Sequence, residues 1–412
     1  MNTAALFRKV LLLALMVSVL VLEGGYMLLT LLLAGFGLAH GRQLPATFAW
    51  VRSSSGASTV MAGLGLYLVV GVLLGVWHSY KINYYEAFVP FVLAPLVLHG
   101  VLSFKMDHRV LWLATAVGAF FALFLAAYQV FWLDVGRAFG GLKNPIIFGD
   151  LSIVFGAIAL LGFVYCPRDA FPKGVRWFLL AGFFFGLGAS LLSGSKGGWM
   201  SVFLILFVFV WTYFSHRSVG FRLAAYGVGL LVVTKLFLLA PSELVLDRIV
   251  GGLGAGWHWF QTGEVTDGSV SVRLELWRRG ILMFDQNWLM GLSTGLPENL
   301  SAQMASIGLP WFGGNLENDL LQTLVSLGLV GFVGKLGMYG LLFWGFLKFR
   351  NSNDVLSRGF SAAGGLLVML YLEFGLSVIV LGHNSFRHVL VVLCMMLLAL
   401  LLQNTPSNKS AQ

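Results

Sequence analysis

Charged side chains are scarce in this chain. Only 10% of its 412 residues are Asp, Glu, Lys or Arg, whereas an ordinary soluble domain has about 25%. Hydrophobic residues reach 58%, aromatic residues 14%, and the mean hydropathy is +0.87. A soluble protein of this size needs a more polar surface, and a disordered protein has few aromatic residues. The composition therefore excludes both classes and indicates an integral membrane protein.

Cysteine is also rare. Cys166 ends one apolar run and Cys394 lies inside another, so we expect neither a disulfide framework nor a thiolate metal site. The sequence has no zinc-protease motif and no Asp-x-Asp pattern, and the glycines of 251–256 do not follow a strand. We therefore predict no metal, no cofactor, and neither a nucleotide nor nucleic acid as a partner.

Long apolar runs dominate the sequence. Most are near the ~20 residues that a spanning helix needs, and they far exceed the ~10 residues of a barrel strand. We therefore expect an all-α polytopic membrane protein. The runs cover 57–77, 84–103, 110–133, 146–166, 177–193, 197–214, 223–240, 319–346, 359–381 and 387–402.

The first apolar run, 5–39, is too long for one span. Glu23, Gly24 and Gly25 interrupt it, and a bare carboxylate in lipid is costly. The run is either one tilted helix or a hairpin of two short helices. Arg8 and Lys9 near its start precede a continuous apolar stretch as in a signal peptide, but no convincing cleavage site follows, so we expect a retained first helix.

Basic residues favour the hairpin. With a hairpin and a cytoplasmic N-terminus, the loops 40–55, 104–109 and 167–176 lie inside together with most of the 26 basic residues. With a single first span these loops change sides, and the cytoplasmic face loses its basic clusters. We therefore predict about 12 transmembrane helices with both termini cytoplasmic, and we attribute the net charge of +9 mainly to this bias.

The runs divide the chain into four parts. Transmembrane helices 1–9 occupy 1–240, a long periplasmic loop or cap occupies 241–318, helices 10–12 occupy 319–402, and 403–412 is a cytoplasmic tail. The loop is predicted to contain short amphipathic helices on the membrane surface. One covers 271–284, with Leu274, Trp277, Ile281 and Phe284 on one apolar face.

Three groups of polar residues lie on the predicted outer face. The first is the turn 193–199, Ser-Gly-Ser-Lys-Gly-Gly-Trp. Small residues such as Ser195 let backbone N–H groups approach a ligand, and Lys196 adds a positive charge. The alternative is an ordinary helix–helix turn with a lysine that extends to the interface.

The second group is the arginine-bearing helix. Arg273, Arg278 and Arg279 occupy one short segment, and guanidinium groups bind phosphate through two parallel hydrogen bonds. The alternative is an interfacial helix that lipid headgroups hold in place.

The third group begins the next span. Asn318 or Asp319 suits a helix cap, but one cap suffices, so Glu317 is left over as a candidate general base. Cations and a base on one face suit a lipid-linked diphosphate that is attacked by a sugar hydroxyl.

At these three places the sequence resembles the O-antigen ligase and Wzy polymerase superfamily. Members typically have a Ser-Arg-Gly-type turn followed by Trp, an Arg-x-x-x-Trp helix followed by Leu-x-Gly-x-Gly, and His-Asn-x-x-Leu followed by Gly-Leu-x-Gly. The corresponding segments here are 194–199, 273–277 with 288–295, and 317–321 with 328–331.

The resemblance implies a GT-C-like bundle in the bacterial inner membrane with its active site facing the periplasm. It implies a metal-independent, inverting transfer of a glycan from undecaprenyl diphosphate to a sugar hydroxyl. By position, Lys196 and Arg273 would bind the diphosphate and Glu317 would take the proton. Arg278 and Arg279 would contact phosphate or headgroups, and Ser195 and Asn318 would bind substrate. The acceptor is a lipid-linked glycan or lipid A–core, and a chain-length regulator is a further candidate partner.

Two residues depart from the family pattern, and the second departure favours a polymerase. Lys196 replaces the usual Arg, and Glu317 replaces the usual His, a change that weakens the alternative of an O-antigen ligase. A His383-Asn384 pair occurs too late in the chain to match the motif, although His383 could face the same cavity and bind substrate or act as the base.

A transporter of a lipid-linked oligosaccharide is the second alternative. It predicts paired charges near mid-span in broken helices. Lys235, Lys335, Glu373 and Glu86 are the candidates, and they show no inverted-repeat spacing.

Overall fold

The chain folds into a helical bundle. The computed structural model describes residues 3–239, 246–266, 269–293, 295–309 and 314–404; most of the predicted tail lies outside these residues. In the described part 81% of the residues are helical and no strand is present. The predicted all-α polytopic class is therefore confirmed. The helices are α1 (Thr3–Val21), α2 (Gly25–Ala39), α3 (Leu44–Ser53), α4 (Ser55–Trp77), α5 (Ile82–Tyr85), α6 (Val89–Phe104), α7 (His108–Ala127), α8 (Pro145–Tyr165), α9 (Lys173–Ser193), α10 (Lys196–Tyr213), α11 (Val219–Leu239), α12 (Leu246–Thr262), α13 (Ser269–Phe284), α14 (Gly295–Ala305), α15 (Asp319–Leu347), α16 (Val355–Phe374) and α17 (Asn384–Gln403).

Nine helical segments in the described part are long and apolar enough to cross a membrane, or up to ten if the bent pair formed by α2 and 41–53 is one span. The nine comprise α4, α8, α9, α10, α15, α16, α17 and the segments Ile82–Phe104 and His108–Trp132. The total of about 12 spans, which also needs α1, α2 and α11, stays a prediction.

The first apolar run forms two helices, as the hairpin interpretation expects. Gly24 adopts a left-handed φ of 74° between α1 and α2. A Cβ atom on Gly25 would lie 2.1 Å from the Ser18 carbonyl oxygen, so only glycine allows the two helices to approach here. Glu23, the carboxylate in this break, pairs with Lys143 at 2.7 Å.

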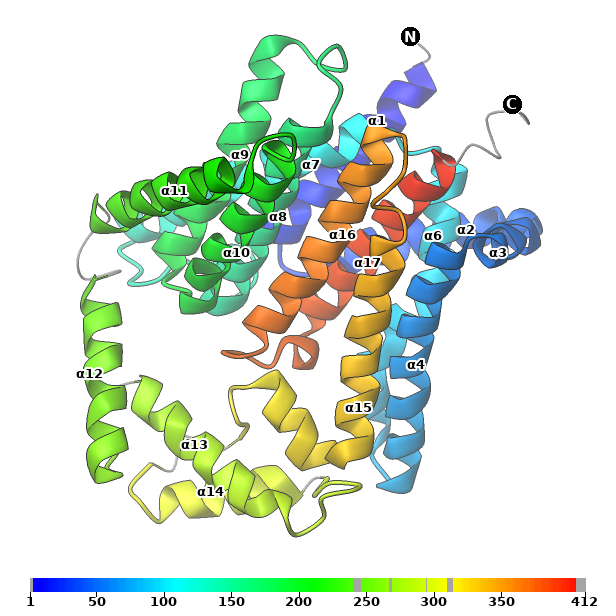
Figure 1. Cartoon of the computed structure of the whole chain (residues 1–412). Coiled ribbons are helices and arrows are strands. Elements are labelled where there is room, and N and C mark those ends of the chain that lie inside the picture. The colour runs from blue at the N-terminus through cyan, green and yellow to red at the C-terminus, as the bar shows by residue number, and fades with distance from the viewer. Residues whose placement is uncertain (1–2, 240–245, 267–268, 294, 310–313, 405–412) are drawn as a thin grey trace.

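The bundle has two distinct ends (Figure 1). The N-terminus and the C-terminus lie at one end, called here the terminal end. The helices α12, α13 and α14 lie at the opposite end, called here the loop end. Successive long helices alternate in direction, so the turn between α9 and α10 and the start of α15 also lie at the loop end.

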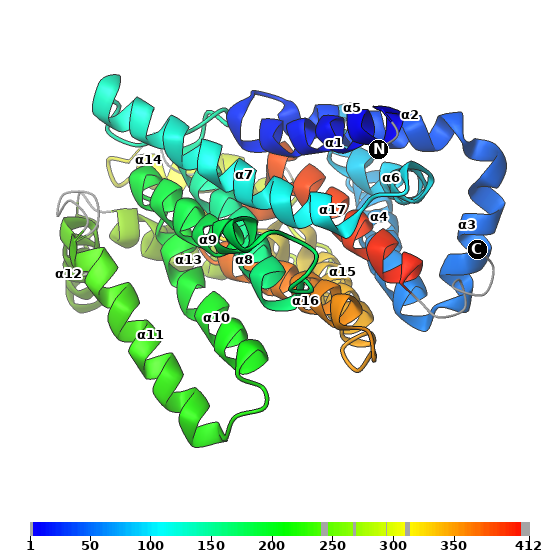
Figure 2. The ribbon, with the colours of Figure 1, turned by 90° about the horizontal axis from the view of Figure 1, so that it is seen from above.

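Two helices form the centre of the bundle. Seen from above, α8 and α17 lie among the other helices, whereas α11 lies at the edge beside α10 (Figure 2). In the most apolar 18 residues of α17 every residue is buried inside the protein, and in those of α8 94% are buried. Because these helices meet protein on every side, a polar side chain in either one must find its partner within the bundle.

The cap around α13 has its own apolar core. Val272, Leu276 and Met283 of α13 pack with residues of α14 and with Leu316. The predicted helix 271–284 is present, and Trp277 and Phe284 of its predicted apolar face pack against the core, but Ile281 is 59% exposed. The buried face also includes the small residue Gly280 and the charged residue Glu275, which a search for large apolar side chains passes over.

Candidate active site at the loop end

The predicted cationic turn joins α9 to α10. Gly194 ends α9 with a left-handed φ of 65°, and Ser195 is the N-cap residue of α10. Ser195 is fully buried, and its Oγ donates a hydrogen bond of 2.5 Å to Oδ1 of Asp150. The structure therefore gives Ser195 a bond that shapes the turn, whereas its predicted role in substrate binding stays a prediction.

Asp150 is the residue that the sequence analysis missed. It lies on α8 with 0% of its side chain exposed. Cβ atoms on Gly197 and Gly198 would lie 3.4 and 3.3 Å from its Oδ1, so the two glycines let the backbone of the turn close over the carboxylate. The available signal was a single acid inside the apolar run 146–166.

Arg137 supports the same turn from another side. Its Nε donates to the Ser193 carbonyl at 2.8 Å, and its Nη2 donates to the Gly194 carbonyl at 3.3 Å. These carbonyls end α9 and have no partner within the helix. The Asp150 carboxylate and the Arg137 guanidinium thus hold the turn, and they fix the position of the Lys196 backbone.

Lys196 points from the turn toward the cap. A Cβ atom on Gly252 of α12 would lie 3.0 Å from Lys196 Nζ. Arg273 and Arg137 lie close enough to Asp150 to interact with it electrostatically. The structure therefore brings the turn that carries Lys196 and the helix that carries Arg273 to one region.

Arg273 faces Glu317. Their Nη2 and Oε2 atoms lie 3.8 Å apart, with 20% and 34% of the side chains exposed. One helical turn further on, Trp277 Nε1 donates to the Leu316 carbonyl at 2.9 Å. The Arg-x-x-x-Trp spacing has a local reason, because residues i and i+4 share a helix face and both here contact the segment before α15.

The segment before α15 holds Glu317 in an unusual conformation. Its φ is 49°, a left-handed value that is uncommon for a residue with a side chain. Asn315 Oδ1 accepts a hydrogen bond of 2.8 Å from the Glu317 N–H, and Gln322 Oε1 accepts one of 2.9 Å from Leu316 N–H. Such strain often accompanies a functional position.

The polar residues after Glu317 have separate structural roles. Asn318 is the N-cap of α15, and its Oδ1 accepts from Leu321 N–H at 2.9 Å. Asp319 pairs with Lys335 at 2.9 Å, and both are almost fully buried. The cap and the ion pair therefore account for Asn318 and Asp319, whereas Glu317 faces Arg273. The substrate contact predicted for Asn318 stays a prediction.

His383 belongs to the same region. It is the N-cap residue of α17, and burial lowers its pKa, which the nearby Glu317 carboxylate partly opposes. A lowered pKa keeps the imidazole neutral near pH 7. Arg387, one turn along α17, donates to Asn384 Oδ1 and is only 7% exposed.

The other two arginines of α13 form a separate cluster. Arg278 Nη2 and Arg279 Nε lie 2.8 and 2.7 Å from Oε1 of Glu275, and Trp259 Nε1 donates to Oε2 of Glu275 at 3.2 Å. These hydrogen bonds hold the pKa of Glu275 below its usual value, although burial acts to raise it. The Trp259 bond thus joins α12 to α13, whereas Arg278 and Arg279 pair with Glu275 within α13 itself. The phosphate contact predicted for the two arginines stays a prediction.

Two segments that contain glycine motifs, 289–293 and 325–330, pair through backbone atoms. This contact is called here the joint. Leu292 and Ser293 N–H donate to the carbonyls of Val325 and Ser326, each at 2.9 Å. Cβ atoms on Gly291 and Gly328 would lie 2.4 and 2.2 Å from the opposite backbone. This joint bends α15 at Gly328, which has a φ of 65°, and sets the place of the segment that carries Glu317.

These features together define a class of protein. The chain is a polytopic helical membrane protein whose loop end gathers Lys196, Arg273, Glu317 and His383. Among the described residues no group of three potential ligands could hold a metal ion.

Residues 181–336 match the family model of the O-antigen ligase. The matched segment contains the turn before α10, the whole cap and the bent start of α15. The match confirms the predicted resemblance to the O-antigen ligase and Wzy superfamily, and it supports an enzyme of the ligase or polymerase type. No curated protein matches the chain.

Proposed function

We propose that this chain transfers a glycan from undecaprenyl diphosphate to a sugar hydroxyl at the periplasmic face of the bacterial inner membrane. The facing pair of Arg273 and Glu317, 3.8 Å apart, is the observation that carries the proposal. It places a phosphate-binding cation beside a carboxylate that can accept a proton. The pair is only part-buried, so a substrate can enter between or beside the two groups.

In this proposal the acceptor hydroxyl oxygen attacks the anomeric carbon as the bond from that carbon to the diphosphate oxygen breaks. Glu317 takes the hydroxyl proton, and undecaprenyl diphosphate leaves with the bonding electron pair. Attack from the face opposite the leaving group inverts the anomeric configuration. Arg273 and Lys196 stabilise the charge that develops on the leaving oxygen, a contribution that needs no metal.

We infer that the acceptor is a second lipid-linked glycan, which makes the protein a Wzy-type polymerase. The carboxylate at Glu317, where ligases have His, supports this choice. Transfer to lipid A–core by a ligase is the alternative. A transporter is less well supported, since Lys335 pairs with Asp319 across the Gly328 bend and is thus committed to a structural contact.

Deleting the gene and examining the surface polysaccharide separates these functions. A polymerase mutant leaves lipid A–core with a single repeat unit, whereas a ligase mutant leaves full-length polymer on the undecaprenyl carrier. An unchanged polysaccharide would contradict the transferase proposal as a whole.

The proposed base is tested by Glu317→Gln in reconstituted vesicles that contain a lipid-linked donor. The amide keeps the shape but cannot accept a proton, so we expect a loss of ~100-fold or more in transfer. Glu264→Gln is the matched control, because Glu264 is a highly exposed loop acid. Full activity of Glu317→Gln would rule it out as the base and point to His383.

A further inference from the structure

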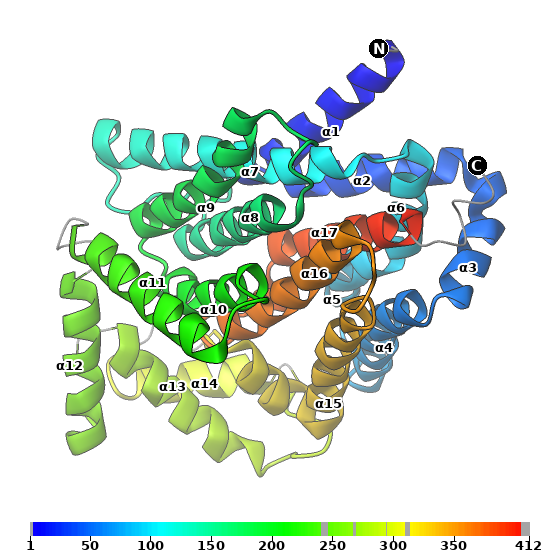
Figure 3. The same cartoon turned by 45° about the horizontal axis from the view of Figure 1, so that its top comes forward.

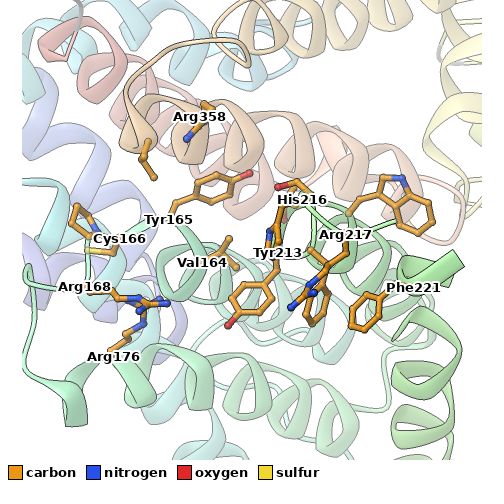
Figure 4. Close-up of a pocket in the computed structure, with 16 residues that line it drawn as sticks. Val164, Tyr165, Cys166, Arg168, Arg176, Tyr213, His216, Arg217, Phe221 and Arg358 are labelled. Carbon is orange, nitrogen blue, oxygen red and sulfur yellow. The ribbon is translucent and has the colours of Figure 1, made fainter. Parts of the chain in front are cut away.

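The terminal end, away from the candidate active site, contains a basic pocket. It has a volume of about 850 Å³ and lies between the end of α8, the start of α9, the turn joining α10 to α11, and the start of α16 (Figures 3 and 4). Four segments that are distant in sequence therefore meet around one space.

Four arginines line this pocket. Arg168 and Arg176 lie on one side, Arg217 lies on the other, and Arg358 comes from α16 (Figure 4). The lining residues include no carboxylate, and within the described ranges none of the four guanidinium groups has a carboxylate within ion-pair distance. Four like charges around one space repel each other unless an anion lies among them.

One guanidinium group of the pocket, that of Arg176, also has a hydrogen-bond donor without an acceptor. Its Nη2 donates to the Phe163 carbonyl at 3.0 Å, and the guanidinium lies over the Phe163 ring at 5.1 Å. Its Nη1 is buried and has no hydrogen-bond partner among the described residues. A buried donor without a partner is costly, so an acceptor from outside the chain would stabilise it.

Aromatic residues surround the same pocket. Tyr165, Trp211 and Tyr213 are among its lining residues, and the Arg217 guanidinium lies over the Phe221 ring at 5.6 Å. Aromatic rings together with arginine are typical of the level of lipid headgroups. Beyond the pocket, apolar side chains of α10 and α11, such as Phe207 and Leu231, are exposed along the outer surface of the bundle.

We propose that this pocket binds the phosphate headgroup of an anionic phospholipid, whose acyl chains lie along α10 and α11. The guanidinium groups supply charge-assisted hydrogen bonds to the phosphate oxygens, and basic pockets between membrane helices suit such headgroups. A general excess of basic residues in cytoplasmic loops would explain why the four arginines lie on one side of the membrane. It would not explain why they line the same pocket.

The test measures phosphatidylglycerol binding to the purified full-length protein by native mass spectrometry. Arg168→Gln combined with Arg217→Gln removes two exposed charges from the pocket, and we expect roughly thirty-fold weaker binding, from about 1 kcal/mol per arginine. The matched control is Arg42→Gln combined with Arg350→Gln, which makes the same charge change on exposed residues that do not line the pocket. Arg358→Gln is a single, milder variant with an expected intermediate effect.

Two competitors identify the ligand. Phosphatidylethanolamine tests the need for net negative charge, and inorganic phosphate tests the need for a lipid. Selective retention of phosphatidylglycerol that phosphate does not displace supports the proposal. Equal retention of both lipids, displacement by inorganic phosphate at similar concentrations, or equal binding by the pocket variant and its control would overturn it.

Discussion

At the scale of single residues, the candidate site depends on side chains that support others. Asp150 and Arg137 bond the turn from two sides, so the position of Lys196 is fixed by residues that need not contact substrate. The sequence indicated the turn through its small residues and its lysine. It could not indicate which carboxylate lies beneath the turn, because α8 and α10 meet only in the folded bundle.

Removing the support should disturb the turn without removing a charge from it. Ser195→Ala deletes a hydrogen bond to a buried carboxylate, which costs about 1.5–3 kcal/mol of folding stability. Thermal unfolding in detergent measures this loss. Ser201→Ala is the control, because the Ser201 hydroxyl is equally buried but bonds only to the Gly198 carbonyl of its own helix. Equal losses in the two variants would show that the bond to Asp150 has no special role.

At Lys196 we expect charge to matter more than geometry. Lys196→Arg keeps the cation and restores the residue type that the family usually has, so we expect transfer within about threefold of the wild type. Lys196→Gln removes the cation, and a loss of ~100-fold is expected if it stabilises the leaving group. Initial transfer rates at saturating donor distinguish the two. Equal activity of the Gln variant would remove Lys196 from the mechanism.

Glu275 links the stability of the cap to pH. Its folded pKa lies below its usual value, so its contribution is fully present above the unfolded pKa of about 4.3 and disappears as pH falls through the folded pKa. Glu275→Gln should lower stability by about 2 kcal/mol at pH 7, with a difference from wild type that shrinks toward pH 3.

The measurement is the thermal unfolding midpoint between pH 7 and pH 3. Glu298→Gln provides the comparison, because it changes an exposed acid in the same cap. A constant gap between Glu275→Gln and the wild type over this range would contradict a link through this carboxylate.

At the scale of elements, the joint between the 289–293 segment and α15 depends on the glycine motifs of both segments. Both glycine patterns were visible in the sequence, but their mutual contact was not, since the two segments pair through backbone atoms. The amphipathic helix of the cap shows the complementary limit. Its existence was predictable from its periodicity, but its buried face was not, because Glu275 is buried through its pairing with arginines.

The joint predicts which glycines tolerate a methyl group. Gly291→Ala would place a Cβ atom 2.4 Å from the Ser326 backbone, so we expect a loss of at least about 3 kcal/mol or a displaced loop. Gly308→Ala is a close control, because Gly308 has the same φ of 82° and nothing within 4 Å. It carries only the cost of the left-handed backbone, about 1 kcal/mol. Limited proteolysis of the cap measures the difference, and equal cleavage of the two variants would contradict the joint.

At the scale of the whole molecule, the alternation of long helices gives a topology that labelling can test. Counting basic residues predicted two short helices in the first run, and the structure has α1 and α2 there with a tight turn at Gly24. Spans of 15–19 residues are weak signals in a sequence, which is why charge had to decide between one helix and two. With two, residue 42 lies on the same side as the N-terminus, and with one it lies on the opposite side.

Single cysteines at three positions test this arrangement in intact cells with a membrane-impermeant maleimide. Cys166 and Cys394 are buried, so the wild-type protein provides an unlabelled background. Glu264→Cys in the loop should react, whereas Ser215→Cys at the turn after α10 and Arg42→Cys should react only after permeabilisation. With a cytoplasmic N-terminus, labelling of both Arg42→Cys and Ser215→Cys but not of Glu264→Cys in intact cells would mean that the first run crosses once. The basic clusters would then lie on the outer side of the membrane, and positive charge would no longer explain the orientation of the chain.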